Sequence, residues 1–213
     1  MFDPIGWLPF RKLRLRNRSV MVVSAVWLLS VAGPFAGPAG ASIITTGDVD
    51  PGGAATQPDP WAVGANLYVG KTGTGALNVT AGGVVSSSHG YLGYSGNSSS
   101  GEVTVTGSGS QWTSAGNTLV GYEGNGELTI SNGASASYVW SSIGRESGSF
   151  GSVVVSDAGS SWTHSAGLMV GYSGTGELTV SNGASVSNTG TYIGNQSGST
   201  GEATVTGTVQ NSN

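Results

Sequence analysis

A short phrase of alternating apolar and polar residues recurs along this chain at an almost constant spacing. The pattern is that of a β-strand with one buried face. Its second apolar residue stands at positions 79, 105, 130, 155, 180 and 205, a period of 25 or 26 residues. A strand this short cannot bury its apolar face alone, and a fixed period of this length is typical of solenoids. The core residues predicted to face inward are Leu77, Val79, Val103, Val105, Leu128, Ile130, Val153, Val155, Leu178, Val180, Ala203 and Val205.

A second marker, a glycine after an aliphatic residue, shows that long and short coils alternate. Its spacings of 23, 28, 23, 27 and 23 residues give a super-repeat of about fifty residues. Trp61, Trp112 and Trp162 each stand nine residues before such a glycine, whereas Trp140 departs from this rule. The marker glycines are Gly70, Gly93, Gly121, Gly144, Gly171 and Gly194.

Each coil reads as three short strands with bends between them. One strand ends at the marker glycine, the recurring phrase forms the next, and a third follows a bend such as Asn132-Gly133 or Asn182-Gly183. Asn-Gly favours a tight bend because both residues tolerate a positive φ. The sequence therefore predicts an all-β fold, a parallel β-helix of about six rungs.

The composition fits an ordered repeat better than disorder. Glycine supplies 38 of the 213 residues and charged residues only 8%, which alone would also suit a disordered chain. The regular placement of Val, Leu and Ile argues for order. Because cysteine is absent, the chain has no disulfide framework, no thiolate metal site and no cysteine nucleophile.

Residues 1–41 contain the three regions of a secretory signal peptide. Five basic residues lie within 11–18, an apolar run covers 19–31, and small residues end in Ala39-Gly40-Ala41. The apolar run is short for a bilayer span. We therefore predict a signal peptide at 1–41, with an uncleaved membrane anchor as the alternative, and an exported protein that is secreted or held at the cell surface.

The remainder divides into a leader and a repeat domain. Residues 42–60 are rich in Gly, Pro and Asp and read as an exposed linker, with a capping strand at 42–46 as the alternative. Residues 61–213 form the predicted β-helix. From Ser42 onward two basic residues, Lys71 and Arg145, stand against ten acidic ones, a net charge of −8. Such a surface excludes nucleic acid as a partner, and contact with a membrane is expected only through the signal or anchor segment.

The repeat resembles a known family. The stretches from Val120-Gly121 through Ala134 and from Ile143-Gly144 through Trp162 are similar to the repeat associated with bacterial type V secretion (autotransporter-like) and PEP-CTERM surface proteins. The resemblance covers about residues 61–207. It implies a bacterial, exported, surface-located β-helical stalk or passenger, and no known activity.

The sequence departs from that family near its C-terminal end. No alternating strands of a membrane barrel and no apolar helix with a basic tail follow the repeats. Register with Trp112 and Trp162 predicts a tryptophan at position 212, where Ser212 stands. Truncation of a longer repeat protein is favoured over a divergent cap.

Several repeated polar positions could form sites. One glutamate precedes the phrase in four coils; we interpret this column as a charged strand edge that deters aggregation, with calcium or carbohydrate binding as the alternative. The outward threonines of the same strand are interpreted as good exposed strand residues, with ice or sugar binding as the alternative. The glutamates are Glu102, Glu127, Glu177 and Glu202.

The remaining candidates are aromatic residues, histidines and charges that break the repeat. Trp61, Trp112 and Trp162 are expected to pack a corner of the coil, with an aromatic sugar platform as the alternative. His89 and His164 are expected in solvated loops. The aperiodic charges Lys71, Arg145, Glu146 and Asp157 form no evident constellation.

The sequence therefore predicts a non-enzymatic structural or adhesin-like module with no catalytic, cofactor-binding or metal-ligating residue. Its partners are left open between a surface carbohydrate and another cell-surface protein. The alternative is a polysaccharide-binding or polysaccharide-degrading β-helix, which would need paired carboxylates or a base beside a metal.

Overall fold

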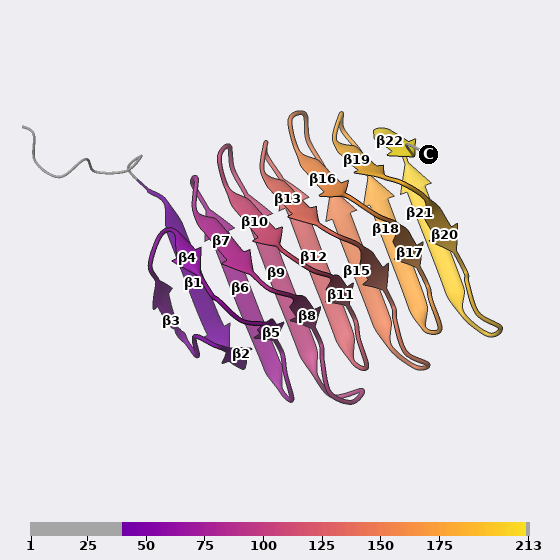
Figure 1. Ribbon diagram of the computed structural model, residues 1–213, viewed down its shortest axis with the longest axis horizontal. Helices are drawn as coiled ribbons and strands as arrows, with labels where there is room; N and C mark the ends of the chain where they lie inside the picture. The colour runs from indigo at the N-terminus through magenta and orange to yellow at the C-terminus, as the bar shows by residue number, and fades with distance from the viewer. Residues whose placement is uncertain (1–39, 212–213) are drawn as a thin grey trace, which may run out of the picture. The chain divides into compact units, whose positions relative to one another are not determined.

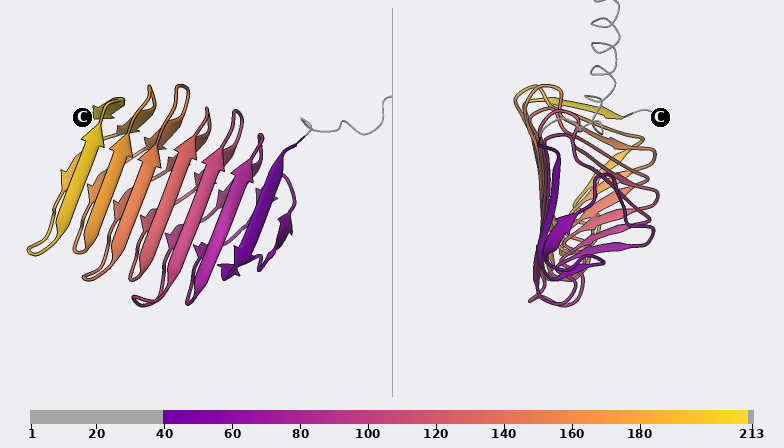
Figure 2. Two further views of the ribbon diagram at one scale, coloured as in Figure 1. Left: turned by 180° about the vertical axis from the view of Figure 1, so that it is seen from behind. Right: turned by 90° about the vertical axis from the view of Figure 1, so that its left-hand side faces the viewer.

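The computed structural model describes residues 40–211, and every regular element in that range is a β-strand (Figure 1). The predicted signal peptide, apart from residues 40 and 41, lies outside the described residues, as does position 212. Within 40–211 no helix is long and apolar enough to cross a bilayer. The chain winds as a parallel β-solenoid of about six turns with a period of about 25 residues, as predicted. Seen from its end, the coils superpose into a roughly triangular outline (Figure 2).

Each turn contributes one strand to each of three sheets. The recurring phrase forms sheet A, in which neighbouring turns pair parallel and in register; Leu77 pairs with Val103, and Leu128 with Val153. The parallel strands of sheet A are β6 (Thr74–Thr80), β9 (Ser100–Thr106), β12 (Asn125–Ser131), β15 (Phe150–Val155), β18 (Thr175–Val180) and β21 (Thr200–Val205).

Sheets B and C are built from the shorter strands of each turn. Sheet B holds the strands that end at the marker glycines: β5 (Leu67–Val69), β8 (Gly90–Leu92), β11 (Thr118–Val120), β14 (Ser141–Ile143), β17 (Leu168–Val170) and β20 (Thr191–Ile193). Sheet C holds seven parallel strands: β4 (Trp61–Ala62), β7 (Val84–Ser87), β10 (Gln111–Ser114), β13 (Ser135–Tyr138), β16 (Ser161–His164), β19 (Ser185–Asn188) and β22 (Thr208–Asn211). The first turn is therefore β4, β5 and β6, and the sixth is β19, β20 and β21.

The segment 42–60 folds as a cap rather than as an exposed linker. Strand β1 (Ser42–Gly47) pairs antiparallel with β6, and β3 (Ala55–Gln57) pairs antiparallel with β1. Strand β2 (Val49–Asp50) pairs antiparallel with β5. Ile43 is completely buried opposite Val79, so β1 covers the inner column that the first turn would otherwise expose. The alternative reading of 42–46 as a capping strand is the one that the structure shows.

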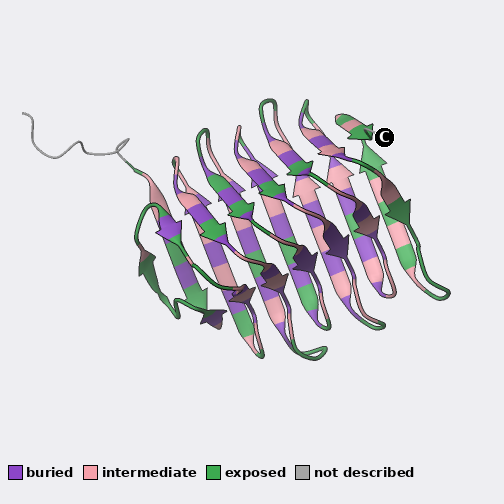
Figure 3. Cartoon of the chain, viewed as in Figure 1, coloured by how far each residue is buried: buried purple, intermediate pink, exposed green. Residues whose placement is uncertain are grey.

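The inward positions of sheet A stack into two continuous apolar columns. In these columns the residues from Leu77 to Val180 are buried in one core cluster. Along β6, β9, β15 and β18, buried positions alternate with intermediate or exposed ones (Figure 3). Val205 differs from the expectation, because its side chain is 45% exposed, and Ala203 is only partly buried. Both lie in β21, the last strand of sheet A, so that no strand within the described residues covers them.

The tryptophans of the super-repeat fill the inside of sheet C. Trp112 and Trp162 are completely buried and Trp61 is 7% exposed, so the packing interpretation holds and the sugar-platform alternative for these three residues is wrong. In register, Trp112 lies between Val85 and Ala136. Large and small inward residues therefore alternate from turn to turn, and this alternation accounts for the fifty-residue super-repeat.

Five of the six marker glycines are required by both conformation and space, whereas at Gly194 a Cβ would meet only the Gly201 amide nitrogen at 3.9 Å. Gly121 has a φ of 70°, and a Cβ there would lie 2.0 Å from the carbonyl oxygen of Phe150 in the next turn. Gly93 has the same constraint against Asn125. A side chain at such a position would thus push neighbouring turns apart. The bends into sheet C use positive φ in the same way, at Asn132 (56°) and Asn182 (54°).

Candidate binding surface on sheet B

Five of the six outward positions of sheet B carry large side chains that the sequence interpretation did not single out. Because successive residues of a strand point to opposite faces, burial of Leu67 and Val69 turns the residue between them outward. Parallel register then stacks the equivalent residues of all six turns into one column. From the first turn to the sixth, this column is Tyr68, Tyr91, Leu119, Ser142, Met169 and Tyr192.

A second column runs beside the first, one residue after the marker glycines. Backbone hydrogen bonds between turns hold it in place; the amide of Tyr94 donates to Gly70 O at 2.9 Å, and that of Tyr172 donates to Gly144 O at 3.0 Å. The column reads Lys71, Tyr94, Tyr122, Arg145, Tyr172 and Asn195. Together with Trp140, the tyrosines of the two columns form what we call the aromatic strip: Tyr68, Tyr91, Tyr94, Tyr122, Trp140, Tyr172 and Tyr192.

The four tyrosines of the first three turns pack against one another. The rings of Tyr68 and Tyr91 stack with their centroids 5.0 Å apart, and those of Tyr94 and Tyr122 stack at 5.2 Å. Tyr91 and Tyr94 meet edge to face at 5.1 Å. Both geometries are favourable for aromatic pairs. Desolvation raises the pKa of the Tyr91 and Tyr122 hydroxyls, so these rings stay uncharged while remaining partly exposed.

The two basic residues of the described chain lie on this strip. Lys71 Nζ stands 4.8 Å from the ring centroid of Tyr68 and forms an ion pair with Asp50; hydrogen bonding to that carboxylate raises the pKa of Lys71. The Arg145 guanidinium lies 4.3 Å from the ring centroid of Tyr172 and 5.4 Å from that of Trp140. These are cation–π distances, so both cations are engaged in contacts with the aromatic strip.

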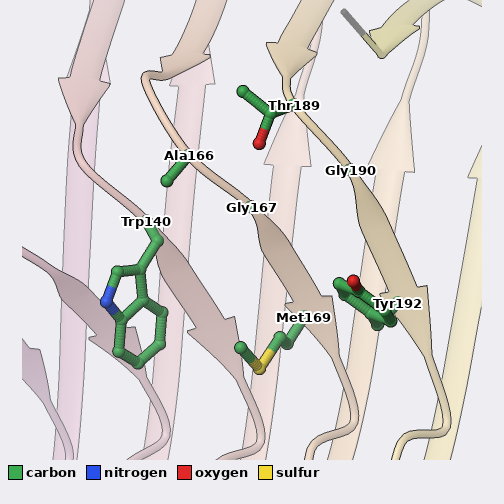
Figure 4. A pocket seen from close by; sticks show the side chains of 7 residues that line it. All are labelled: Trp140, Ala166, Gly167, Met169, Thr189, Gly190 and Tyr192. Atoms are coloured by element: carbon green, nitrogen blue, oxygen red, sulfur yellow. The ribbon is translucent and has the colours of Figure 1, made fainter. Parts of the chain in front are cut away.

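The strip contains an apolar hollow of about 300 Å³ over the fourth to sixth turns. Figure 4 shows Trp140, Met169 and Tyr192 following one another across neighbouring strands. Two glycines, Gly167 and Gly190, lie on the segments that lead into the strands of Met169 and Tyr192. Ala166 and Thr189 complete the lining. We call this site the Trp140 hollow.

A second hollow, of about 550 Å³, lies over the loops that follow the marker glycines in the second to fourth turns. It is lined by Gly96, Asn97, Tyr122, Glu123, Glu146 and Ser147. Its two carboxylates are in contact with other groups: Glu123 Oε2 accepts from the Gly96 amide at 3.0 Å, and Glu146 Oε1 lies 3.5 Å from Arg145 Nε. Within residues 40–211 no group of three or more His, Asp or Glu side chains is placed to hold a metal ion.

The predicted glutamate ladder is present on the outside of sheet A. Glu102 pairs in register with Glu127, and Glu177 with Glu202. All four side chains are exposed, and Ser152 separates the two pairs. The ladder therefore lies on a different sheet from the aromatic strip. The outward threonines of the same strands flank it.

One of the two histidines is not in a solvated loop. His164 ends strand β16 and is 4% exposed, because it occupies an inward position of sheet C. Its Nε2 lies 3.0 Å from Ser141 Oγ and its Nδ1 lies 3.4 Å from Ser187 O. Desolvation lowers the pKa of His164 to about 4. His89 remains partly exposed, and its Nδ1 accepts from the Asn117 amide at 3.0 Å.

Asp157, the other aperiodic charge, serves the bend in which it stands. It has a φ of 74°, and its Oδ2 lies 3.3 Å from both the Asn132 amide and Ser156 Oγ. It thus occupies the place that Asn132 and Asn182 hold in other turns.

No protein-family profile, curated protein or solved structure matches this chain at a significant level. The resemblance to the secretion-associated and surface-protein repeats therefore stays a prediction.

The sequence contained a signal for the aromatic strip. Tyrosine follows the marker glycine at Tyr94, Tyr122 and Tyr172, and Trp140 is the tryptophan that breaks the nine-residue rule. The repeat pattern alone does not place these residues side by side. Register across the turns is what joins them.

Proposed function

We propose that this chain is an exported structural module of the cell surface or the secreted fraction, adhesin-like, that binds through its aromatic strip and catalyses no reaction. The observation that supports this most is the strip itself. Seven aromatic side chains line one side of a solenoid, and each is fixed by a strand or bend whose backbone is bonded to its neighbours. A rigid scaffold of this kind holds planar side chains ready for contact, which limits the entropy lost on binding.

The absence of catalysis is supported by the contacts of the charged residues. Lys71 is paired with Asp50, Arg145 lies against two aromatic rings, and Asp157 accepts a hydrogen bond from the Asn132 amide in the bend of the preceding turn. Each of these charges has a role in the fold, which weakens the case for a polysaccharide-degrading site. Turnover of pectin or alginate that is lost on Asp157→Asn would contradict this part of the proposal.

Adhesion through the strip can be tested with purified protein and whole cells or cell-wall preparations. The double variant Tyr68→Ala/Trp140→Ala should reduce retention, because both side chains lie outward and half-exposed on the strip. The matched control is Thr104→Ala/Thr129→Ala on the outside of sheet A. Equal retention of the two variants would contradict binding through the strip.

Export can be tested separately. Residues 1–41 fused to a reporter enzyme should direct it out of the cytoplasm, and the mature reporter should begin at Ser42. Retention of the whole fusion inside the cell would contradict the proposed location.

A further inference from the structure

The Trp140 hollow has the features of a site for a flat, uncharged ligand. Its walls are an indole, a thioether and a phenol, and none of its seven lining residues carries an Asp, Glu, Lys, Arg or His side chain. Arg145, which contacts the Trp140 ring, does not line the hollow; its guanidinium packs against Tyr172 and lies 3.5 Å from a Glu146 carboxylate oxygen, so the lining itself offers no partner for a carboxylate or a phosphate. A charged ligand would lose hydration here without gaining an ion pair.

The hollow exists because the sequence breaks its own pattern in three consecutive turns. The column of residues that immediately precedes the sheet B strands reads Asn66, His89, Asn117, Trp140, Gly167 and Gly190. Trp140, the largest side chain of this column, is thus followed by glycine at the equivalent position of the next two turns. Because glycine has no side chain, the space beside the indole stays open. A Cβ at Gly190 would meet nothing within 4 Å, so no neighbouring group uses this space, and Gly190 has no positive φ.

The spacing of the walls fits a chain of sugar rings. Trp140 belongs to the fourth turn, Met169 to the fifth and Tyr192 to the sixth. Two strand spacings, about 10 Å, therefore separate the two aromatic residues along the solenoid axis. An extended oligosaccharide presents apolar C–H faces of its rings at intervals of this order. Tyr192 is 59% exposed, so its ring is available for stacking, and the Thr189 side chain supplies a hydroxyl at the rim.

From these observations we infer that the Trp140 hollow binds an uncharged glycan, whose sugar rings stack on Trp140 and Tyr192 along the solenoid axis. This inference rests on the proposed adhesive function and names its ligand class. The four stacked tyrosines of the first three turns extend the same strip, but their rings contact one another, and the hollow beside Tyr122 is also lined by the carboxylates of Glu123 and Glu146.

The decisive variant fills the hollow without disturbing the fold. Gly190→Leu places a side chain in the open space, and its main-chain carbonyl can still accept from the Leu168 amide, a 2.9 Å bond. Ala65→Leu is the matched control, because Ala65 is an exposed residue of the same linking segment in the first turn, far along the sequence from the hollow. Trp140→Ala removes one wall.

Binding is measured by calorimetry on the whole chain with cello-, xylo-, manno- and chito-oligosaccharides, and with pectate and alginate fragments as charged probes. We expect saturable binding of at least one uncharged oligosaccharide. Its association constant should fall by about tenfold or more on Trp140→Ala and on Gly190→Leu, which is the scale of one lost aromatic stack. The Ala65→Leu variant should bind like the parent.

Three outcomes would overturn the inference: binding of no uncharged probe, binding that Gly190→Leu leaves unchanged, or binding restricted to the charged fragments. Unfolding curves of each variant show whether a loss of binding reflects a loss of fold. If the chain still adheres to cells through the strip while no glycan binds in the hollow, the proposed function stands and the ligand class is wrong. If adhesion also fails, both are wrong.

Discussion

Acid should destabilise this solenoid through His164. The imidazole is buried among uncharged groups, with Tyr138 and Trp162 packed against it and Ser141 Oγ 3.0 Å from Nε2. Desolvation lowers the pKa of His164 in the folded chain from 6.5 to about 4. Between these two values the unfolded chain binds the proton and the folded chain does not, so folding stability falls as the pH falls from about 6.5 to 4. Below about pH 4 both states are protonated and this loss is complete.

The magnitude follows from the size of the pKa difference. Each pKa unit corresponds to about 1.4 kcal/mol, so the full loss is about 3 kcal/mol and most of it, about 2.5 kcal/mol, is reached by pH 4.5. The assay is denaturant unfolding at pH 7 and pH 4.5. His164→Asn is the comparison, because asparagine occupies the equivalent inward position in the next turn at Asn188. The two proteins share every other side chain, so contributions from the rest of the chain cancel in the difference.

We expect the parent to lose about 2.5 kcal/mol more than His164→Asn over this interval. Equal losses in the two proteins would show that the ring is solvated or is protonated without penalty, and would refute the burial argument.

Three further tests, which use five substitutions, probe the packing of the turns. Trp112→Ala should destabilise the fold by about 3–5 kcal/mol because it leaves a cavity on the inner side of sheet C, whereas Trp140→Ala on the outside should have an effect of about 1 kcal/mol or less. Chemical denaturation measures both variants. Equal effects would contradict the inward and outward assignments. Gly121→Ala should destabilise the fold by about 2 kcal/mol or more, since it combines a positive φ with a clash against the next turn. Gly190→Ala should be within about 0.5 kcal/mol of the parent. Thermal melts distinguish the two variants, and a stable Gly121→Ala would argue against close approach of the turns. Ile130→Asp places a charge in the core column and should lower stability by roughly 4 kcal/mol or more, seen as new trypsin sensitivity; a protease-resistant variant would count against the column.

The repeating part of the fold could be predicted from the sequence because one physical requirement recurs in every turn. Each phrase strand must bury the same face, so apolar residues such as Leu128 and Ile130 return at a fixed spacing. The bends at Asn132 and Asn182 were also readable, since few residues tolerate their positive φ.

The ends of the stack could not be predicted in the same way. The repeat pattern predicts burial for a residue that has a neighbouring strand on either side. Val205 lies in β21, the last strand of sheet A, and has a neighbouring strand on one side within the described residues. Ile43 is buried because β1 runs antiparallel to the first turn as a cap. The repeat pattern does not predict this antiparallel cap.

The candidate surface was missed for a related reason. Tyr91 points outward from β8, and the ring of Tyr94, three residues later and beyond a bend, lies against it with a centroid distance of 5.1 Å. The repeat pattern does not indicate this contact. His164 was misplaced because a polar residue near glycines and serines resembles a loop residue, although it stands at an inward position of β16. Which polar residues face inward depends on where each short strand begins.

The central claim is that equivalent residues of successive turns lie beside one another in parallel register. It can be tested by cysteine cross-linking, since the natural chain has no cysteine. Thr104 and Thr129 are register partners on the outside of sheet A, so Thr104→Cys/Thr129→Cys places two thiols on adjacent strands about 4.8 Å apart, within the range for a disulfide. Mild oxidation should join this pair rapidly, and should leave Thr104→Cys/Thr179→Cys, three turns apart, reduced. Cross-linking of the distant pair, or none of the adjacent pair, would contradict the stacked parallel turns.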